Sequence, residues 1–299
     1  MSHLEYKKGF IFALLGAALF AVSDVFVRLG GNELNAWHIM AARSLVGVVA
    51  LPLLARWFKQ NLWGKAPGIL SLTGIVGVIG MTCLMYSFLT VTLFEALVLL
   101  YLHPVVAALL SPFLTKDRLT SRDWGCIFLA FFGTVLVLWP GEFEARLGWG
   151  HLMGLAAACS NGLYMTLVRR LSPNTNALTP LFYMCFLGVL AAVFPLTMTA
   201  NATVPAAGGI MAALGCGLFA MGAHLCTNHA LKHMASPHVG VIQMGEVLMA
   251  GLMGVCFFDE LMSWRIALGG AFILAGGAAL SLRNHKTTLM VKPAQPFGS

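Results

Sequence analysis

Charged side chains are scarce in this sequence. Asp, Glu, Lys and Arg make up 10% of its 299 residues, while 59% of the residues are hydrophobic. Soluble domains carry about 25% charged residues, so the composition excludes a soluble globular protein and favours a chain that crosses a lipid bilayer many times. The net charge of +7 is spread between apolar runs. No basic patch is formed, and we expect no nucleic-acid partner.

Paired cysteines are also missing. The seven Cys residues all lie inside apolar runs, and no two of them have the spacing of a CxxC motif. An odd number of thiols in this setting indicates packing residues and excludes both a disulfide framework and a cysteine metal site. We therefore expect no metal and no cofactor. The sequence contains no nucleophile or metal-ligand motif of an enzyme, so we also expect no catalytic residues.

What the sequence does contain is a series of apolar runs of membrane-spanning length. A helix rises 1.5 Å per residue, so about 20 apolar residues cross a hydrocarbon core of roughly 30 Å. Ten such runs occur, joined by short connections, and predict ten transmembrane helices in an all-α membrane protein. Their expected ranges are 9–29, 36–56, 68–90, 93–115, 123–140, 150–169, 177–198, 207–230, 236–257 and 264–282.

The distribution of Lys and Arg predicts the orientation of these helices. With the N-terminus in the cytoplasm, fourteen of the 18 basic residues fall at cytoplasmic helix ends, as the positive-inside rule requires. An even number of crossings returns the C-terminus to the same side. We expect a multi-pass integral protein of a bacterial inner (plasma) membrane, with both termini cytoplasmic.

The two halves of the chain repeat each other. When Gly9 is aligned with Gly150, Gly47 falls on Gly188 without a gap. Each half contains five predicted helices, so the second half enters the membrane from the opposite side. Inverted repeats with a site at their interface are an architecture of secondary transporters. The predicted organisation is a first five-helix repeat over 1–140, a second over 141–283 and a disordered cytoplasmic tail over 284–299.

Three motifs occur in order along the chain. The first helix ends in Ser23-Asp24-Val25-Phe26-Val27-Arg28, the second carries Arg43 after Trp37-His38, and an acidic-Leu turn precedes a glycine-rich helix at both Asp117 and Asp259. Together these motifs resemble the EamA-type ten-helix transporters of the drug/metabolite transporter superfamily. The resemblance implies transport of small metabolites through a cavity among the third, fourth, eighth and ninth helices. Asp24 with Arg43 is most similar to a subgroup resembling S-adenosylmethionine and riboflavin carriers.

Polar residues interrupt the fourth and ninth predicted helices near their centres. His103 and Pro104 lie in the run 93–115, and Gln243 and Glu246 lie in the run 236–257. Ionisable groups at this depth are costly and usually face a cavity. When the two acidic turns are aligned, Pro104 falls on Glu246, so a charge replaces the kink in the ninth helix. We expect a substrate site formed by His103, Glu246, Gln243, Tyr101, Asn161, Tyr164 and His224.

Each of these candidates also has a structural interpretation. Glu246 would then pair with His103 or His224 and hold the two halves together. Asp24 and Arg43 lie at similar depths, with Arg28 one helical turn from Asp24. These three form an extracellular gate, a site for a substrate carboxylate, or an ion pair that fixes the first two helices. The sequence leaves these alternatives open.

The predicted function is secondary transport by alternating access. We expect an exporter of a small polar or amphipathic metabolite, such as an amino-acid-like or carboxylated compound, with protons as a candidate coupling ion. The protein would act as a monomer or homodimer in the lipid bilayer. Two alternatives remain: an importer of a riboflavin- or S-adenosylmethionine-like compound, and a membrane-embedded lipid enzyme, which no motif in the chain supports.

Overall fold

The protein is described here by a computed structural model that covers residues 3–30, 34–91, 93–117, 119–139, 148–198, 205–258 and 264–287. Within these ranges every regular element is an α-helix. The first half contains α1 (His3–Gly30), α2 (Ala36–Trp57), α3 (Pro67–Thr90), α4 (Leu93–Leu100), α5 (His103–Leu114) and α6 (Ser121–Leu138). The second half contains α7 (Trp149–Leu171), α8 (Leu178–Met198), α9 (Ala207–His233), α10 (Ser236–Gln243), α11 (Gly245–Phe258) and α12 (Trp264–Thr287).

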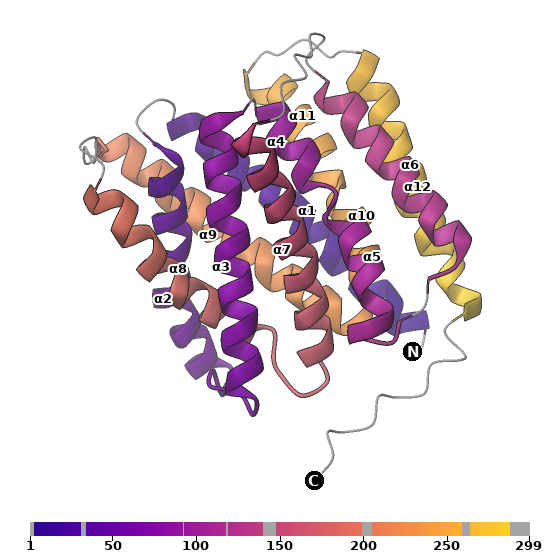
Figure 1. The fold of residues 1–299 in the computed structure, drawn as a ribbon, viewed down its shortest axis with the longest axis horizontal. Helices are drawn as coiled ribbons and strands as arrows, with labels where there is room; N and C mark the ends of the chain where they lie inside the picture. The colour runs from indigo at the N-terminus through magenta and orange to yellow at the C-terminus, as the bar shows by residue number, and fades with distance from the viewer. Residues whose placement is uncertain are drawn as a thin grey trace.

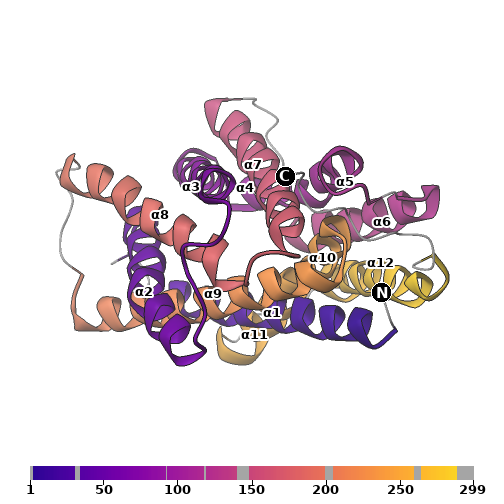
Figure 2. The ribbon, with the colours of Figure 1, turned by 90° about the horizontal axis from the view of Figure 1, so that it is seen from below.

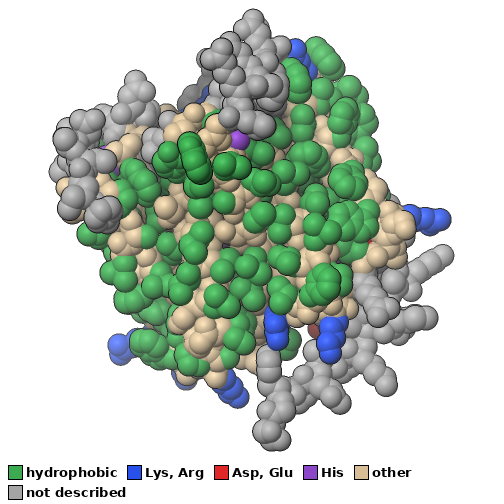
Figure 3. All heavy atoms as spheres, in the orientation of Figure 1, with side chains coloured by type: hydrophobic (Ala, Val, Ile, Leu, Met, Phe, Trp, Pro, Cys, Tyr) green, Lys and Arg blue, Asp and Glu red, His purple; other side chains and the backbone are tan. Residues whose placement is uncertain are grey.

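The surface of this bundle is that of a membrane protein. Figure 3 shows apolar side chains covering most of the visible face, and residues such as Ile11, Val49 and Phe113 are more than half exposed. A soluble monomer rarely exposes so large an apolar area. Within the described part of the chain, six helical stretches are long and apolar enough to cross a bilayer: Glu5–Gly30, Trp37–Trp57, Pro67–Ser87, Ala96–Leu114, Leu178–Thr197 and Ala207–His233. The expectation of an all-helical membrane protein is confirmed.

Two of the ten predicted helices are broken in the middle. α4 and α5 are separated by a turn at Tyr101 and Leu102, and α10 and α11 by a turn at Met244. At Met244 the backbone N–H donates to the Gly240 and Val241 carbonyls, both at 3.2 Å, which tightens the chain locally. The alignment of the two acidic turns also places Leu102 on Met244. The kink expected only in the fourth helix therefore occurs in both repeats, although the ninth helix has no proline at the break.

The two halves pack in a symmetric pattern. α1 packs on α9 as α7 packs on α3, and α2 packs on α9 as α8 packs on α3, while α2–α8 and α6–α12 are pairs of equivalent helices. Glycines that align between the two repeats also make equivalent contacts. A Cβ on Gly47 would meet Cys185, and one on Gly188 would meet Ser44. Aligning the two glycines also aligns Ser44 with Cys185, so the repeat symmetry exchanges these two contacts. The structure thus contains the two five-helix repeats that the sequence predicts.

The two ends of the bundle differ in charge. α1 begins and α12 ends at the lower end in Figure 1, and most of the visible Lys and Arg side chains lie along this end in Figure 3. α12 continues to Thr287, beyond its expected end at residue 282. Residues 288–299 and the acidic turn at Asp259 lie outside the described residues. The end of the bundle where α1 begins and α12 ends is called the lower end, and the opposite end is called the upper end.

Glycine permits the closest approach between α6 and α12. A Cβ on Gly133 would lie 2.5 Å from the Gly269 carbonyl oxygen and 2.9 Å from the backbone nitrogen of Ile273. Backbone atoms cannot move away as a flexible side chain can. In contrast, a Cβ on Gly125 of the same helix would meet nothing within 4 Å.

These two glycines provide a matched test of the packing. Gly133→Ala should lower the free energy of unfolding by about 1–3 kcal/mol, because the added methyl group forces the helices apart. Gly125→Ala should be neutral or stabilising by up to about 1 kcal/mol, because alanine has the higher helix propensity. Thermal unfolding of the detergent-purified variants measures both effects. Equal melting of Gly133→Ala and wild type would contradict the close approach.

Candidate functional site

Two acidic side chains from different repeats meet in the interior. Asp24 lies in the upper part of α1, and Glu246 lies in the first turn of α11. Their carboxyl groups are within hydrogen-bonding reach of each other. Such a hydrogen bond requires a proton on one of the two groups, because two carboxylates at this range repel each other. With one shared proton, the pair would carry one negative charge.

Tyr101 completes the contact between the two helix breaks. It occupies the turn between α4 and α5, is 4% exposed, and its hydroxyl hydrogen-bonds to the Glu246 carboxyl. One interrupted helix thus supplies the acid and the equivalent interruption supplies the phenol. Glu246 also lies at the N-terminus of α11, where free backbone N–H groups favour negative charge.

Arg43 supplies the positive charge beside this pair. It lies on α2, close enough to interact electrostatically with both Asp24 and Glu246. Its guanidinium carbon is 5.7 Å from the centre of the Phe20 ring, and the His224 ring meets Phe20 edge-on at 4.9 Å. One guanidinium and one singly charged carboxyl pair leave the cluster close to neutral, as burial at this depth requires.

Arg43 also lines a small pocket. The pocket lies among α2, α3, α8 and α9 and has a cavity volume of about 30 Å³. Five of its twelve lining residues contain sulfur, and Arg43, Ser44 and His224 are its polar members. The remaining lining residues are Met40, Val78, Met81, Leu181, Met184, Cys185, Gly188, Ala220 and Met221.

His103 does not face this cluster. Its Nδ1 lies 3.0 Å from the Leu100 carbonyl oxygen, and its Nε2 packs against Gly240 of α10 without a hydrogen-bond partner among the described residues. The reason is local, since Pro104 has no N–H to donate to the Leu100 carbonyl and the imidazole takes its place. The suggested pairing of Glu246 with His103 or His224 is therefore not what the structure shows.

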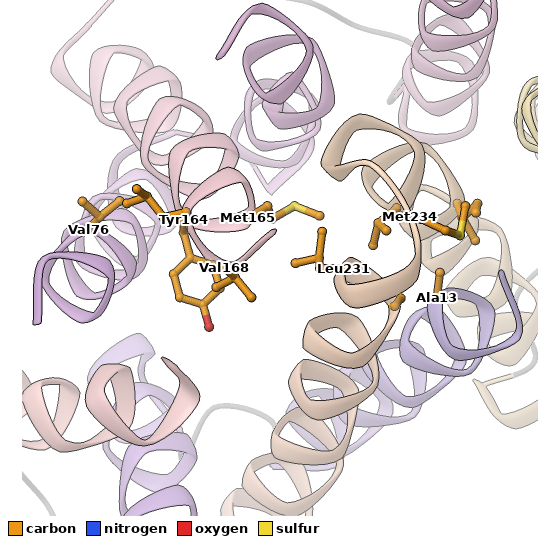
Figure 4. Packing of buried hydrophobic residues seen from close by; sticks show 11 residues of the cluster. Ala13, Val76, Tyr164, Met165, Val168, Leu231 and Met234 are labelled. Carbon is orange, nitrogen blue, oxygen red and sulfur yellow. The ribbon is translucent and has the colours of Figure 1, made fainter. Parts of the chain in front are cut away.

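Two other predicted site residues contact protein groups instead of the carboxyl pair. Gln243 is 7% exposed, and its Nε2 donates to the Thr227 hydroxyl at 2.7 Å, which ties α10 to α9. Tyr164 belongs to a buried apolar cluster between α3, α7 and α9 (Figure 4), and its hydroxyl accepts a 3.5 Å hydrogen bond from Asn228. These contacts fix helices relative to one another.

The remaining candidates are divided between the pocket and the periphery of the site. His224 lines the pocket beside Arg43. Asn161 is half-buried on α7, where the helix passes Gly80 of α3. Arg28 is exposed near the upper end of α1, and the groups that act electrostatically on Asp24 are Arg43 and Glu246.

The lower half of the bundle is closed by a second polar cluster that the sequence reading missed. Arg169 Nε lies 3.5 Å from Asp117 Oδ2, and Arg169 Nη1 donates to the carbonyls of Leu231 and Lys232 at 2.9 Å. These contacts, named here the lower clasp, join the end of the first repeat's α5 to α7 and α9. The sequence signal for this contact was the position of Arg169 in the second repeat, because the alignment of the repeats places Arg28 on Arg169.

Buried hydroxyl groups reinforce this closure above the clasp. The hydroxyls of Ser111 and Ser236 are 3.2 Å apart, and that of Thr166 lies 3.3 Å from Ser236. These side chains come from α5, α10 and α7, and all three are fully buried. These contacts tie α5, α7 and α10 to one another in the interior.

The Gln243–Thr227 contact allows a direct measurement. Gln243→Leu should lower the free energy of unfolding by about 1 kcal/mol, the net value of a buried hydrogen bond plus the cost of an unpaired group. The double variant with Thr227→Val should recover part of this loss, giving a coupling energy of at least about 0.5 kcal/mol in a double-mutant cycle. Strictly additive effects in denaturant unfolding would show that the two side chains do not interact.

Two repeats with broken helices, whose breaks meet at charged residues, define the class of secondary transporters built from inverted repeats. The chain belongs to the EamA-like transporter family, whose model matches residues 7–139 and again residues 148–282. The sequence-based resemblance is thereby confirmed, and with it an integral membrane transporter of small molecules.

Individual relatives agree with this assignment. The chain is 24% identical to the pseudopaline exporter CntI of Pseudomonas aeruginosa over 279 residues, covering 92% of this chain and 96% of the relative. It is 23% identical to human solute carrier family 35 member G1, covering 92% and 79%. A solved crystal structure superposes with a TM-score of 0.84 at 18% identity, covering 94% of this chain and 99% of that one, which shows the common fold.

Proposed function

We propose that this protein exports a small amino-acid-like metabolite in exchange for protons. The observation that carries the proposal is the Asp24–Glu246 carboxyl pair, held beside Arg43 where the two helix breaks meet. The pair contains an exchangeable proton, and Arg43 is a permanent cation. A metabolite with an ammonium and a carboxylate group matches both.

Competition for the carboxyl pair would couple the two fluxes. An ammonium group binds best when both carboxyls are ionised, and proton binding removes that charge. Proton and substrate would then occupy the site in turn, and an inward proton gradient would drive the substrate outward. Arg43 would hold the substrate carboxylate in either case, through charge-assisted hydrogen bonds.

Alternating access requires the lower end to open at some stage of the cycle. The lower clasp would have to break, because Asp117 belongs to the first repeat while Arg169 and its acceptors belong to the second. The density of basic residues supports a cytoplasmic lower end in a bacterial inner membrane. An exporter among the relatives supports the outward direction over import of a vitamin- or nucleoside-like compound.

The coupling can be tested in proteoliposomes with labelled amino acids, polyamines, riboflavin and S-adenosylmethionine. Glu246→Gln should abolish uptake driven by a pH gradient, at least a tenfold loss, because the amide cannot release a proton. Asp24→Asn should have the same effect. Exchange of labelled substrate across the membrane without a pH gradient then shows whether the two variants still bind the substrate.

A matched control separates coupling from folding. Gly125→Ala leaves the interior unchanged and should transport as wild type does. If Glu246→Gln retains full gradient-driven uptake, the carboxyl pair is structural and proton exchange takes place elsewhere. If no panel compound moves in wild type while the protein is folded and inserted, the proposed substrate class is wrong.

The lower clasp makes a separate prediction about conformation. Asp117→Asn should weaken the clasp and increase the time that the lower end is open. A cysteine introduced at Ser236, in a background without the seven native cysteines, should then react several-fold faster with an impermeant maleimide. Arg122→Gln, which changes an exposed charge on α6, should leave the labelling rate unchanged. Equal rates in the two variants would argue against a gating role for the clasp.

A further inference from the structure

Within the described residues, the His103 side chain has one hydrogen-bond partner, a backbone carbonyl. The side chain is buried, and its Nδ1 lies 3.0 Å from the Leu100 carbonyl oxygen. Because a carbonyl oxygen can only accept a hydrogen bond, Nδ1 carries the proton and Nε2 keeps a lone pair. Nε2 has no partner in the part of the chain that the structure describes. A proton carrier needs a partner within hydrogen-bonding reach, so this geometry does not support that role for His103.

The Leu100 carbonyl is the group that Pro104 leaves without a donor. In a continuous helix the N–H of residue 104 would bond to this carbonyl, and proline has none. The turn before it is intact, since the Tyr101 N–H donates to the Leu97 carbonyl at 2.9 Å. An unsatisfied carbonyl at this depth would cost free energy. The imidazole therefore completes the hydrogen bonding of the turn that carries Tyr101.

Two glycines enclose His103 in this position. A Cβ on Gly240 would lie 3.3 Å from His103 Nε2 and 2.9 Å from Pro104 Cγ. A Cβ on Gly162 would lie 2.8 Å from the His103 carbonyl oxygen. These glycines belong to α10 and α7, which pack beside α5 (Figure 2). The Tyr101 ring is 6.0 Å from the imidazole, centre to centre. A residue enclosed in this way has little freedom and can fix the geometry of the turn.

We propose that His103 is a positioning residue for the carboxyl pair and that it acts through Tyr101. The Tyr101 hydroxyl hydrogen-bonds to the Glu246 carboxyl, and the turn that the imidazole completes determines where this hydroxyl lies. The inference rests on the proposed function for the role of the pair in transport. It adds that a neutral histidine of the first repeat controls the geometry of the acid supplied by the second.

Infrared spectroscopy of the purified protein reports on this contact without a substrate. The difference spectrum between acid and alkaline pH contains the C=O stretch of the carboxyl that gains a proton, and the band lost in Glu246→Gln belongs to the pair. Tyr101→Phe should move this band to higher frequency, because a hydrogen bond to a carbonyl oxygen lowers its stretching frequency. His103→Leu should move the band in the same direction, since the turn is no longer fixed.

Two further variants separate the hydrogen bond of His103 from its packing. The amide nitrogen of asparagine can take the place of Nδ1, whereas that of glutamine reaches the place of Nε2. His103→Asn should therefore keep the wild-type frequency, and His103→Gln should show the shift. If His103→Leu does not fold, these two variants make the same test.

A double variant tests whether the effect passes through Tyr101. His103→Leu combined with Tyr101→Phe should shift the band no further than Tyr101→Phe alone, because both changes remove the same contact. Uptake driven by a pH gradient should follow the same order. Each single variant should lose roughly fivefold, the value of one hydrogen bond, and His103→Asn should transport as wild type does.

The outcomes distinguish this inference from the proposed function. If His103→Leu and His103→Gln leave the band in place while Tyr101→Phe moves it, or if the shifts add in the double variant, His103 does not act through Tyr101. The inference then fails even where proton-driven uptake is observed. If the bands shift as expected while no compound of the panel is transported, the positioning role stands and the proposed substrate class is wrong.

Discussion

An ionisable group inside a membrane protein must be neutralised or paired, and this requirement governs the centre of the molecule. Asp24, Glu246 and Arg43 come from three helices, and none of them is stable at this depth alone. Sharing one proton between the two carboxyls leaves a single negative charge for the guanidinium. The arrangement joins α1, α2 and α11, and in the proposed function the addition or loss of one proton would change it. Stability and the proposed response to protons would then arise from the same contacts.

The helix breaks bring these groups together. A continuous helix buries its backbone groups in its own hydrogen bonds, whereas the turns at Leu102 and Met244 place helix termini in the interior. Tyr101 and Glu246 lie directly beside these turns, so one repeat's break hydrogen-bonds to the other's. Below them, hydroxyl groups and the lower clasp close the bundle. These contacts connect α5, α7, α9 and α10 below the charged centre.

Much of this architecture could be predicted from the sequence, because hydrophobic length and the placement of basic residues respond to the bilayer alone. The repeat could be recognised because Gly47 and Gly188 are required by the same close contact. The partners of Glu246 could not be predicted. The sequence indicates a gate or an ion pair for Asp24, and its meeting with Glu246 depends on how α1 packs against α11. The contact of His103 with the Leu100 carbonyl could not be predicted, because the carbonyl freed by Pro104 is a local detail that composition does not show. The small pocket beside Arg43 could not be foreseen, since methionine at helical spacing is usually ordinary packing.

The helices of the two repeats are arranged symmetrically, whereas the charged residues of the site are not repeated. The alignment of Gly47 with Gly188 carries Asp24 onto Met165 and Arg43 onto Met184, and the alignment of the acidic turns relates Glu246 to Pro104. Asp24, Arg43 and Glu246 therefore have no charged counterpart at the positions related to them by the repeat. The two access states of the proposed cycle would therefore not be mirror images in energy. A bundle with this inequality would have a preferred resting side even when no gradient is applied.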